Sequence, residues 1–310
     1  MEKEVFQLYK ERTLGEKIND TFGFLRDNWR PVGQWFVYLM LPLSMVAAVP
    51  VQNMLAASMR QTITGGSMSA EELLMQKFGS QVGMLLTLFC TSLILTMVQL
   101  YLRREQRLEH LSASDVLQPL LSTAGALFLM SLAMAVTLIP IVLVMALLAV
   151  LFNEMLGTGF TVLLLIMMMV VLLPMMMMCM PVYAFERKEG VGVFAAILKG
   201  FKLGWNTLGG LLGLMVVMGF IILALSAILQ GPAVGIWMVD FFKAYSSGTV
   251  GASPSILTSF WNYLLSVFIL AGGQLCGMIW TLSLVLHYGH AREKIEGVAV
   301  DNEIESFDKL

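Results

Sequence analysis

Charged residues are scarce in this sequence. Asp, Glu, Lys and Arg make up 13% of the 310 residues, whereas a soluble globular domain typically has about 25%. Hydrophobic residues make up 58%, and the mean hydropathy is +0.80. This composition excludes an ordinary soluble domain and predicts an integral membrane protein.

The sequence also has no excess of basic residues and few cysteines. Because the formal net charge is −2, we expect no nucleic-acid partner, which would need a strongly basic surface. Cys90, Cys179 and Cys276 all lie inside apolar runs, and this placement argues against a disulfide framework. No A-x-A-type cleavage site follows the first apolar run, so we expect no cleavable signal peptide.

Motifs of catalysis and of ion coupling are missing as well. The sequence has no nucleophile–base set, P-loop or dinucleotide fingerprint, and its LGGLLG run (208–213) is entirely apolar. An ionisable group at mid-membrane costs at least about 2.5–3.5 kcal/mol and commonly marks an ion path, yet no charge lies deep in an apolar run. We therefore predict no enzyme activity, no cofactor, and no proton or sodium coupling.

Six long apolar runs are present. They predict an all-α, polytopic helical bundle of three hairpins, with a single membrane domain over residues 1–290 and a flexible cytoplasmic tail over 291–310. Polar loops are expected over 54–80 and 230–259. The predicted spans are about residues 32–51, 82–102, 124–152, 160–183, 208–229 and 260–288.

The distribution of cations predicts the orientation. Of the 19 Lys and Arg residues, all except Arg60, Lys77 and Lys243 fall in segments on the side of the two termini. Loops rich in Lys and Arg stay in the cytoplasm. Both termini are therefore expected to be cytoplasmic.

Residues 191–205, just before the fifth span, predict an amphipathic helix on the membrane surface. Its apolar side chains fall at i, i+3, i+4, i+7 and i+11, and they are Phe194, Ile197, Leu198, Phe201 and Trp205. Lys199 and Lys202 lie off this face and are expected to meet anionic headgroups. Similar but weaker patterns begin at Leu14 and near Asp115, so each hairpin is predicted to follow a cytoplasmic surface helix.

Small residues in the last two spans predict close helix packing. Gly209 with Gly213, and Gly273 with Gly277, are small-xxx-small pairs. They serve either ordinary packing within the bundle or an oligomer interface. Gln274 is interpreted as an interhelical hydrogen-bonding residue, with a substrate contact as the alternative.

Two patterns raise the question of a metal. His287 and His290 stand at i, i+3, but no third ligand is near in sequence, so an interfacial helix end is the favoured interpretation and no metal is predicted. The 25 methionines include the runs 167–169 and 175–178, whose sulfur atoms would suit Cu(I). Consecutive methionines point in all directions around a helix, which favours packing and lipid contact.

Two segments resemble a known family. LGEKINDTFGFLRDNW (14–29) and FAAILKGFKLGWNTLGGLLGL (194–214) are similar to a broad bacterial family of six-span proteins. It includes the membrane domain found before some glycerophosphodiester phosphodiesterases and the YciC-like inner-membrane proteins. The resemblance implies a six-helix bundle with cytoplasmic surface helices in a bacterial inner membrane. This chain has no phosphodiesterase domain, so no catalytic residue transfers.

These observations favour a non-catalytic membrane protein that acts as a scaffold, a partner-binding protein or an envelope-homeostasis component. The expected partners are membrane lipids and either a membrane protein or a second copy of the chain. The alternative is an uncoupled transporter or channel for an apolar or amphipathic molecule such as a lipid. A third hypothesis is Cu(I) handling.

Overall fold

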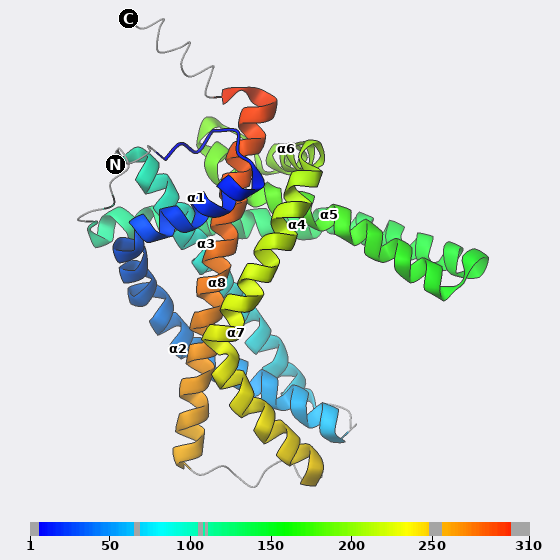
Figure 1. Ribbon diagram of the computed structural model, residues 1–310. Helices are drawn as coiled ribbons and strands as arrows, with labels where there is room; N and C mark the ends of the chain where they lie inside the picture. The colour runs from blue at the N-terminus through cyan, green and yellow to red at the C-terminus, as the bar shows by residue number, and fades with distance from the viewer. Residues whose placement is uncertain (1–5, 65–68, 105–107, 109–110, 248–255, 299–310) are drawn as a thin grey trace, which may run out of the picture. The chain divides into compact units, whose positions relative to one another are not determined.

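The computed structural model describes residues 6–64, 69–104, 108, 111–247 and 256–298. Every regular element in these ranges is a helix (Figure 1), which confirms the predicted all-α class. The helices are α1 (Leu14–Asp27), α2 (Trp29–Thr64), α3 (Ala70–Arg103), α4 (Ala113–Leu156), α5 (Thr158–Glu186), the short 3-10 helix η1 (Arg187–Glu189), α6 (Val193–Asn206), α7 (Leu208–Ser247) and α8 (Ile256–Glu296).

Six helices of the described part are long and apolar enough to cross a membrane: α2, α3, α4, α5, α7 and α8. The predicted polytopic helical architecture is therefore confirmed. The helices continue beyond the predicted spans, so the predicted loops over 54–80 and 230–259 are wrong for most of their length. α2 ends at Thr64 and α3 begins at Ala70, while α7 continues to Ser247.

A capping box explains the early start of α3. The Ser69 backbone N–H donates to Glu72 Oε2 at 2.9 Å, and the Glu72 N–H donates to Ser69 Oγ at 3.1 Å. Such a reciprocal pair satisfies two backbone donors that the first helical turn leaves without partners. The helix therefore begins at Ala70, about a dozen residues before the apolar run.

Two further predictions need correction. α4 begins behind a Ser112–Asp115 capping box and continues past Pro119 to Leu156, so the second predicted surface helix forms the first turns of α4 instead of a separate helix. α8 continues to Glu296, so residues 291–296 of the predicted tail are helical. The rest of that tail, from residue 299, lies outside the described residues.

The chain divides into two compact units. Unit 1 comprises residues 1–27, 95–219 and 281–310, and unit 2 comprises residues 28–94 and 220–280. The long helices α3, α7 and α8 each contribute one segment to each unit. The predicted single domain over 1–290 is thus built from two packing units.

Unit 2 joins α2 to the neighbouring parts of α3 and α8. Gly79 of α3 lies against α2 so closely that a Cβ there would be 2.5 Å from the Pro50 carbonyl oxygen. The Tyr263 hydroxyl of α8 donates to the Met45 carbonyl of α2 at 2.9 Å. Glycine is required at position 79 because any side chain would push the two helices apart.

Gln274 of α8 also lies in unit 2, where α8 meets α3. Its side-chain Nε2 is 3.5 Å from Thr87 Oγ1. Its backbone carbonyl oxygen accepts from Cys90 Sγ at 3.2 Å. Both partners belong to α3. The structure thus places Gln274 at a contact between two helices, in the position expected for an interhelical hydrogen-bonding residue.

Unit 1 contains the α4–α5 hairpin, with α6 packed against α5 (Figure 1). A Cβ on Gly200 would be 2.7 Å from the Cys179 Cα, and one on Gly204 would be 2.9 Å from the Met175 Cα. α6 therefore presents a small-xxx-small pair to α5, and Met175 packs directly on it.

The glycine pairs predicted for packing do not make such close contacts within the chain. A Cβ at Gly209 or Gly277 would meet nothing within 4 Å among the described residues, and one at Gly213 or Gly273 would make an ordinary contact at 3.8 or 3.7 Å. The close approach occurs at Gly200 and Gly204 instead, because α6 lies flat on α5. An oligomer interface at the predicted pairs stays a prediction.

Candidate functional site

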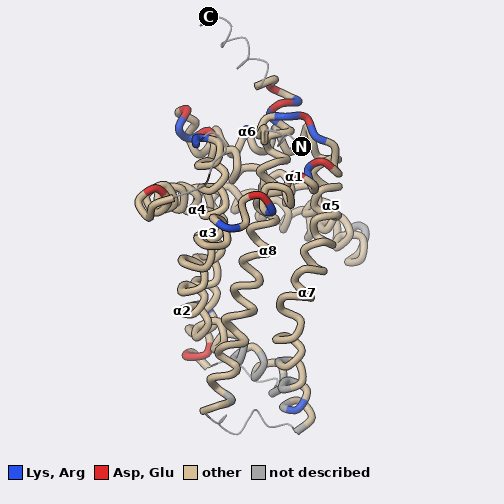
Figure 2. Tube along the Cα trace, turned by 60° about the vertical axis from the view of Figure 1, so that its left-hand side comes forward, with Lys and Arg blue, Asp and Glu red and all other residues tan. Residues whose placement is uncertain are grey.

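Charged residues of unit 1 gather around α1, α6, the C-terminal ends of α3, α5 and α8, and the first turn of α4 (Figure 2). We call this region the polar end of unit 1. It contains two buried polar clusters and a pocket lined by two cations. Each is built from residues that lie far apart in the sequence.

The first cluster surrounds Glu186, the last residue of α5, which is only 1% exposed. Lys199 Nζ of α6 lies 2.8 Å from its Oε2, and Arg292 Nη1 of α8 lies 3.4 Å from its Oε1. The Tyr288 hydroxyl also donates to Oε1, at 2.9 Å. One buried carboxylate thus connects three helices.

Glu296 completes this Glu186 cluster. Its carboxylate lies 3.0 Å from Lys199 Nζ and 2.7 Å from Arg292 Nε. Two carboxylates therefore face two cations, and the cluster is charge-balanced. Removing one partner of a buried ion pair leaves an uncompensated charge and typically costs about 3–5 kcal/mol.

This arrangement corrects the expected role of the α6 lysines. Lys199 binds two carboxylates of the chain and does not face outward as expected for a headgroup contact. Ile197, predicted to lie on the outward apolar face, is 6% exposed, and its carbonyl accepts from Cys179 Sγ at 3.6 Å. Lys202 is exposed.

The rest of the predicted α6 face stays outside. Phe194, Leu198 and Trp205 are more than half exposed, and Phe201 is intermediate. Since α6 packs on α5 through Gly200 and Gly204, these large side chains point away from α5. A partly exposed apolar face therefore remains on α6, as expected for a surface helix.

The second cluster has Lys17 of α1 at its centre. Lys17 is 2% exposed, and its Nζ lies 3.1 Å from His287 Nδ1 of α8. His287 Nε2 lies 3.1 Å from Thr207 Oγ1, which donates to the Leu203 carbonyl at 2.8 Å. An ammonium can only donate, so Nδ1 accepts, Nε2 carries the proton, and the Thr207 hydroxyl accepts from Nε2.

Lys17 forms no ion pair with a carboxylate in the described part of the chain. Burial, together with the positive charges of Arg12 and Lys294, lowers its pKa from 10.5 to about 8. Around this Lys17 cluster the charge is therefore unbalanced and positive, in contrast to the Glu186 cluster.

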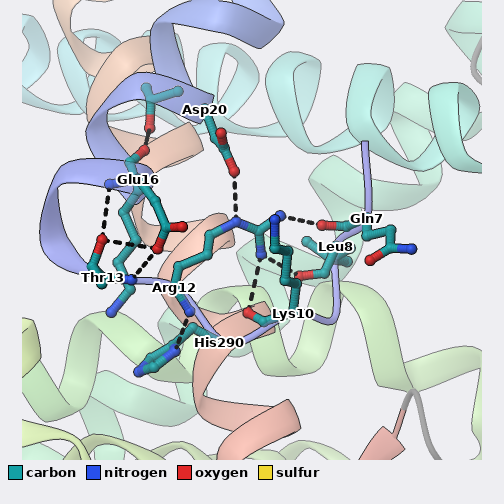
Figure 3. A network of polar contacts seen from close by, with 10 residues as sticks. Gln7, Leu8, Lys10, Arg12, Thr13, Glu16, Asp20 and His290 are labelled. Carbon is teal, nitrogen blue, oxygen red and sulfur yellow. Dashed lines mark hydrogen bonds and ion pairs between the residues drawn. The ribbon is translucent and has the colours of Figure 1, made fainter. Parts of the chain in front are cut away.

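Arg12 stabilises the segment before α1 through an ion pair and hydrogen bonds (Figure 3). Its Nε lies 2.7 Å from Asp20 Oδ2. Its guanidinium donates to the carbonyls of Leu8, at 2.9 Å, and of Gln7. The segment is thus folded around a single side chain, which is almost fully buried.

The same segment packs against α8. The Arg12 backbone N–H donates to His290 Nδ1 at 3.0 Å, and a Cβ on Gly289 would collide with the Leu8 carbonyl oxygen. His287 and His290 therefore contact two different parts of the amino-terminal region. No group of three His, Cys, Asp or Glu side chains in the described ranges is placed to hold a metal ion.

A pocket of about 130 Å³ lies between the C-terminal end of α3 and the start of η1. Its lining residues are Gln99, Leu102, Arg103, Ala184, Phe185 and Lys188. Gln99 Nε2 donates to the Ala184 carbonyl at 2.9 Å and so joins the two walls. We call this the basic pocket, because both charged residues in its lining are cations.

Sequence reasoning missed most of these residues. The Lys17–His287 pair spans 270 residues, and no local pattern indicates such a contact. A signal did exist for Gly200 and Gly204, which form a small-xxx-small pair inside the predicted surface helix. HYGH (287–290) was noticed, but for a metal, whereas its histidines hydrogen-bond to α1, to the α6–α7 junction and to the segment before α1.

Comparison of the chain with known proteins finds no matching family model, no matching curated protein and no matching solved structure.

Proposed function

We propose that this chain is a non-catalytic, multi-pass protein of a bacterial cytoplasmic membrane that acts as a scaffold for a partner, as an envelope-homeostasis component would. Six apolar helices support the membrane embedding. The concentration of Lys and Arg on the side of the termini supports a cytoplasmic placement of both ends. The resemblance of residues 14–29 and 194–214 to YciC-like proteins supports the bacterial envelope.

The observation that supports a scaffold best is the charge-balanced Glu186 cluster. Its four ionisable groups bind one another across α5, α6 and α8, as does the Tyr288 hydroxyl. Groups that are fully engaged in this way hold helices in place, whereas catalytic groups need access to a substrate. The cluster therefore favours a fixed platform with α6 on its surface.

α6 offers this platform an exposed apolar surface. Phe194, Leu198 and Trp205 stand at i, i+4 and i+11 and are 63%, 73% and 63% exposed. Large aromatic side chains on a rigid element are enriched where proteins bind one another. We infer that this face of α6 contacts the partner at the membrane surface.

Site-specific photocrosslinking in cells tests the proposal. A photoreactive amino acid at Leu198 should yield one discrete protein adduct, and the same partner should be captured from Phe194. Val216, which is 57% exposed on α7, is the matched control, and it should give lipid adducts only. Lipid adducts alone at all three positions would contradict the scaffold role and favour α6 as a plain membrane anchor.

A further inference from the structure

The basic pocket lies where two candidate spans end. Arg103 is the last residue of α3, and Lys188 belongs to η1, directly after α5. Both helices are apolar enough to cross a membrane. Residues that follow a span directly lie at the level of the lipid headgroups, in whichever direction the span is crossed.

The charge of the two cations of the basic pocket is not balanced within the described part of the chain. Neither Arg103 nor Lys188 forms an ion pair with a carboxylate in the described part of the chain, whereas the adjacent Arg104 lies 3.0 Å from Asp115 Oδ2. The neighbouring Arg187 is also engaged, since it donates to the Ser122 carbonyl at 2.6 Å. Two exposed residues of like charge therefore line one pocket.

Helix ends explain only part of this arrangement. The carbonyl groups at a helix C-terminus favour one nearby cation, which accounts for one positive charge at the end of α3 and one after α5. They do not account for a shared cavity between the two cations, with Gln99 fixed on the Ala184 carbonyl at its base. A bound anion would offset both charges at once.

We propose that the basic pocket binds the phosphate group of an anionic lipid, with Arg103 and Lys188 as its two cationic contacts. The cavity of about 130 Å³ is about ten times the space that one water needs, so a hydrated phosphate fits. Leu102 and Phe185 in the lining offer apolar contact to the glycerol end. The proposal of a lipid site applies to either orientation of the chain in the membrane, and it does not depend on the proposed scaffold role.

Native mass spectrometry of the purified, detergent-solubilised chain tests the site. Phosphatidylglycerol is the anionic probe, phosphatidylethanolamine the zwitterionic probe, and inorganic phosphate the lipid-free probe. Each cation near an anionic lipid surface contributes about a fivefold gain in affinity. Arg103→Gln with Lys188→Gln should therefore weaken phosphatidylglycerol binding about 25-fold and leave phosphatidylethanolamine binding unchanged.

Two further variants make the result specific. Lys10→Gln with Lys77→Gln removes the same charge from exposed lysines outside the pocket, and it should bind phosphatidylglycerol like the unaltered chain. Arg103→Lys with Lys188→Arg keeps both charges and should retain most of the binding. Melting temperatures of all variants in detergent show that each is folded.

Three results would overturn the proposal. The first is equal loss of phosphatidylglycerol in the pocket variant and in the Lys10/Lys77 control, since binding would then follow net charge alone. The second is equal retention of both lipids by the unaltered chain. The third is displacement of the lipid by millimolar inorganic phosphate, which would make the pocket a site for free phosphate instead.

Discussion

Lys17→Met tests whether the Lys17 cluster is electrostatically costly. The substitution keeps an unbranched side chain of similar length and removes the positive charge. Lys17 has no carboxylate partner among the described residues, and its pKa is lowered from 10.5 to about 8, mainly by burial. In the folded chain the charged form is therefore disfavoured relative to the unfolded chain.

The sign of the pH dependence follows from these two pKa values. Below about pH 8 both states hold the proton and the penalty is present in full. Between about pH 8 and pH 10.5 only the unfolded state still holds the Lys17 proton, so the free energy of unfolding rises with pH. The difference between the two pKa values is equivalent to about 3 kcal/mol of unfolding free energy. About 2 kcal/mol of this stability should be gained between about pH 7 and pH 9.5.

At pH 7 the variant is expected to be no less stable than the unaltered chain. Removal of the charge should gain up to about 3 kcal/mol. The substitution also leaves His287 Nδ1 without its donor, and an unsatisfied buried acceptor costs about 1–3 kcal/mol. Because these terms nearly cancel, the decisive quantity is the slope of stability against pH.

The assay is equilibrium unfolding of the purified chain in mixed micelles, with a denaturing detergent as the titrant, at several pH values from about 7 to about 9.5. Lys202→Met removes an exposed α6 lysine and is the matched control. The control should keep the rise of about 2 kcal/mol, and Lys17→Met should lose it. Equal slopes in Lys17→Met and the unaltered chain would refute the electrostatic account of this cluster.

Three further predictions concern topology, charge and packing. Reporter fusions should be periplasmic at Gly157 and cytoplasmic at Glu189, and a cytoplasmic result at Gly157 would exclude the proposed orientation of the α4–α5 hairpin. Glu186→Gln should lower the free energy of unfolding in mixed micelles by up to about 5 kcal/mol, because it removes the buried carboxylate and leaves Lys199 and Arg292 with Glu296 as their remaining partner; an unchanged value would show that the ion pairs of Glu186 contribute little. Gly200→Ala should lower the melting temperature, because a Cβ there would be 2.7 Å from a backbone atom of α5, whereas Gly219→Ala, with nothing within 4 Å, is a control; equal effects would contradict the close packing of α6 on α5.

The hydropathy of the sequence was enough to predict the six apolar helices, since a run of about 20 apolar residues has few other uses. It was not enough to predict where helices end. The ends depend on capping residues such as Ser69 and on long-range contacts such as that between Glu296 and Lys199. Neither is an apolar signal, so the predicted loops were too long.

The candidate site was harder to predict for a different reason. Each cluster joins the end of α8 to elements from other parts of the chain, and the contacts of α8 with those elements span 80 residues or more, as for Thr207 and His287. A single sequence indicates which residues share one helical face, but it does not indicate which faces meet. Two features had a sequence signal: Gly200 and Gly204 form a small-xxx-small pair, and the basic pocket lies where cations commonly follow a span.

The buried polar clusters can be explained by the way in which the surface helices α1 and α6 are held to the bundle. α1 buries Lys17, Thr21 and Phe24; α6 likewise engages Lys199 in ion pairs and exposes most of its apolar face. If both helices lie at the membrane surface, their exposed apolar side chains contact lipid or a partner, and the opposite faces hold them to the bundle. Polar faces can be buried only when their charges and donors are satisfied. Surface helices of this kind therefore use internal partners such as Glu186 and His287, and the expectation that Lys199 meets lipid headgroups is the step at which sequence reasoning failed.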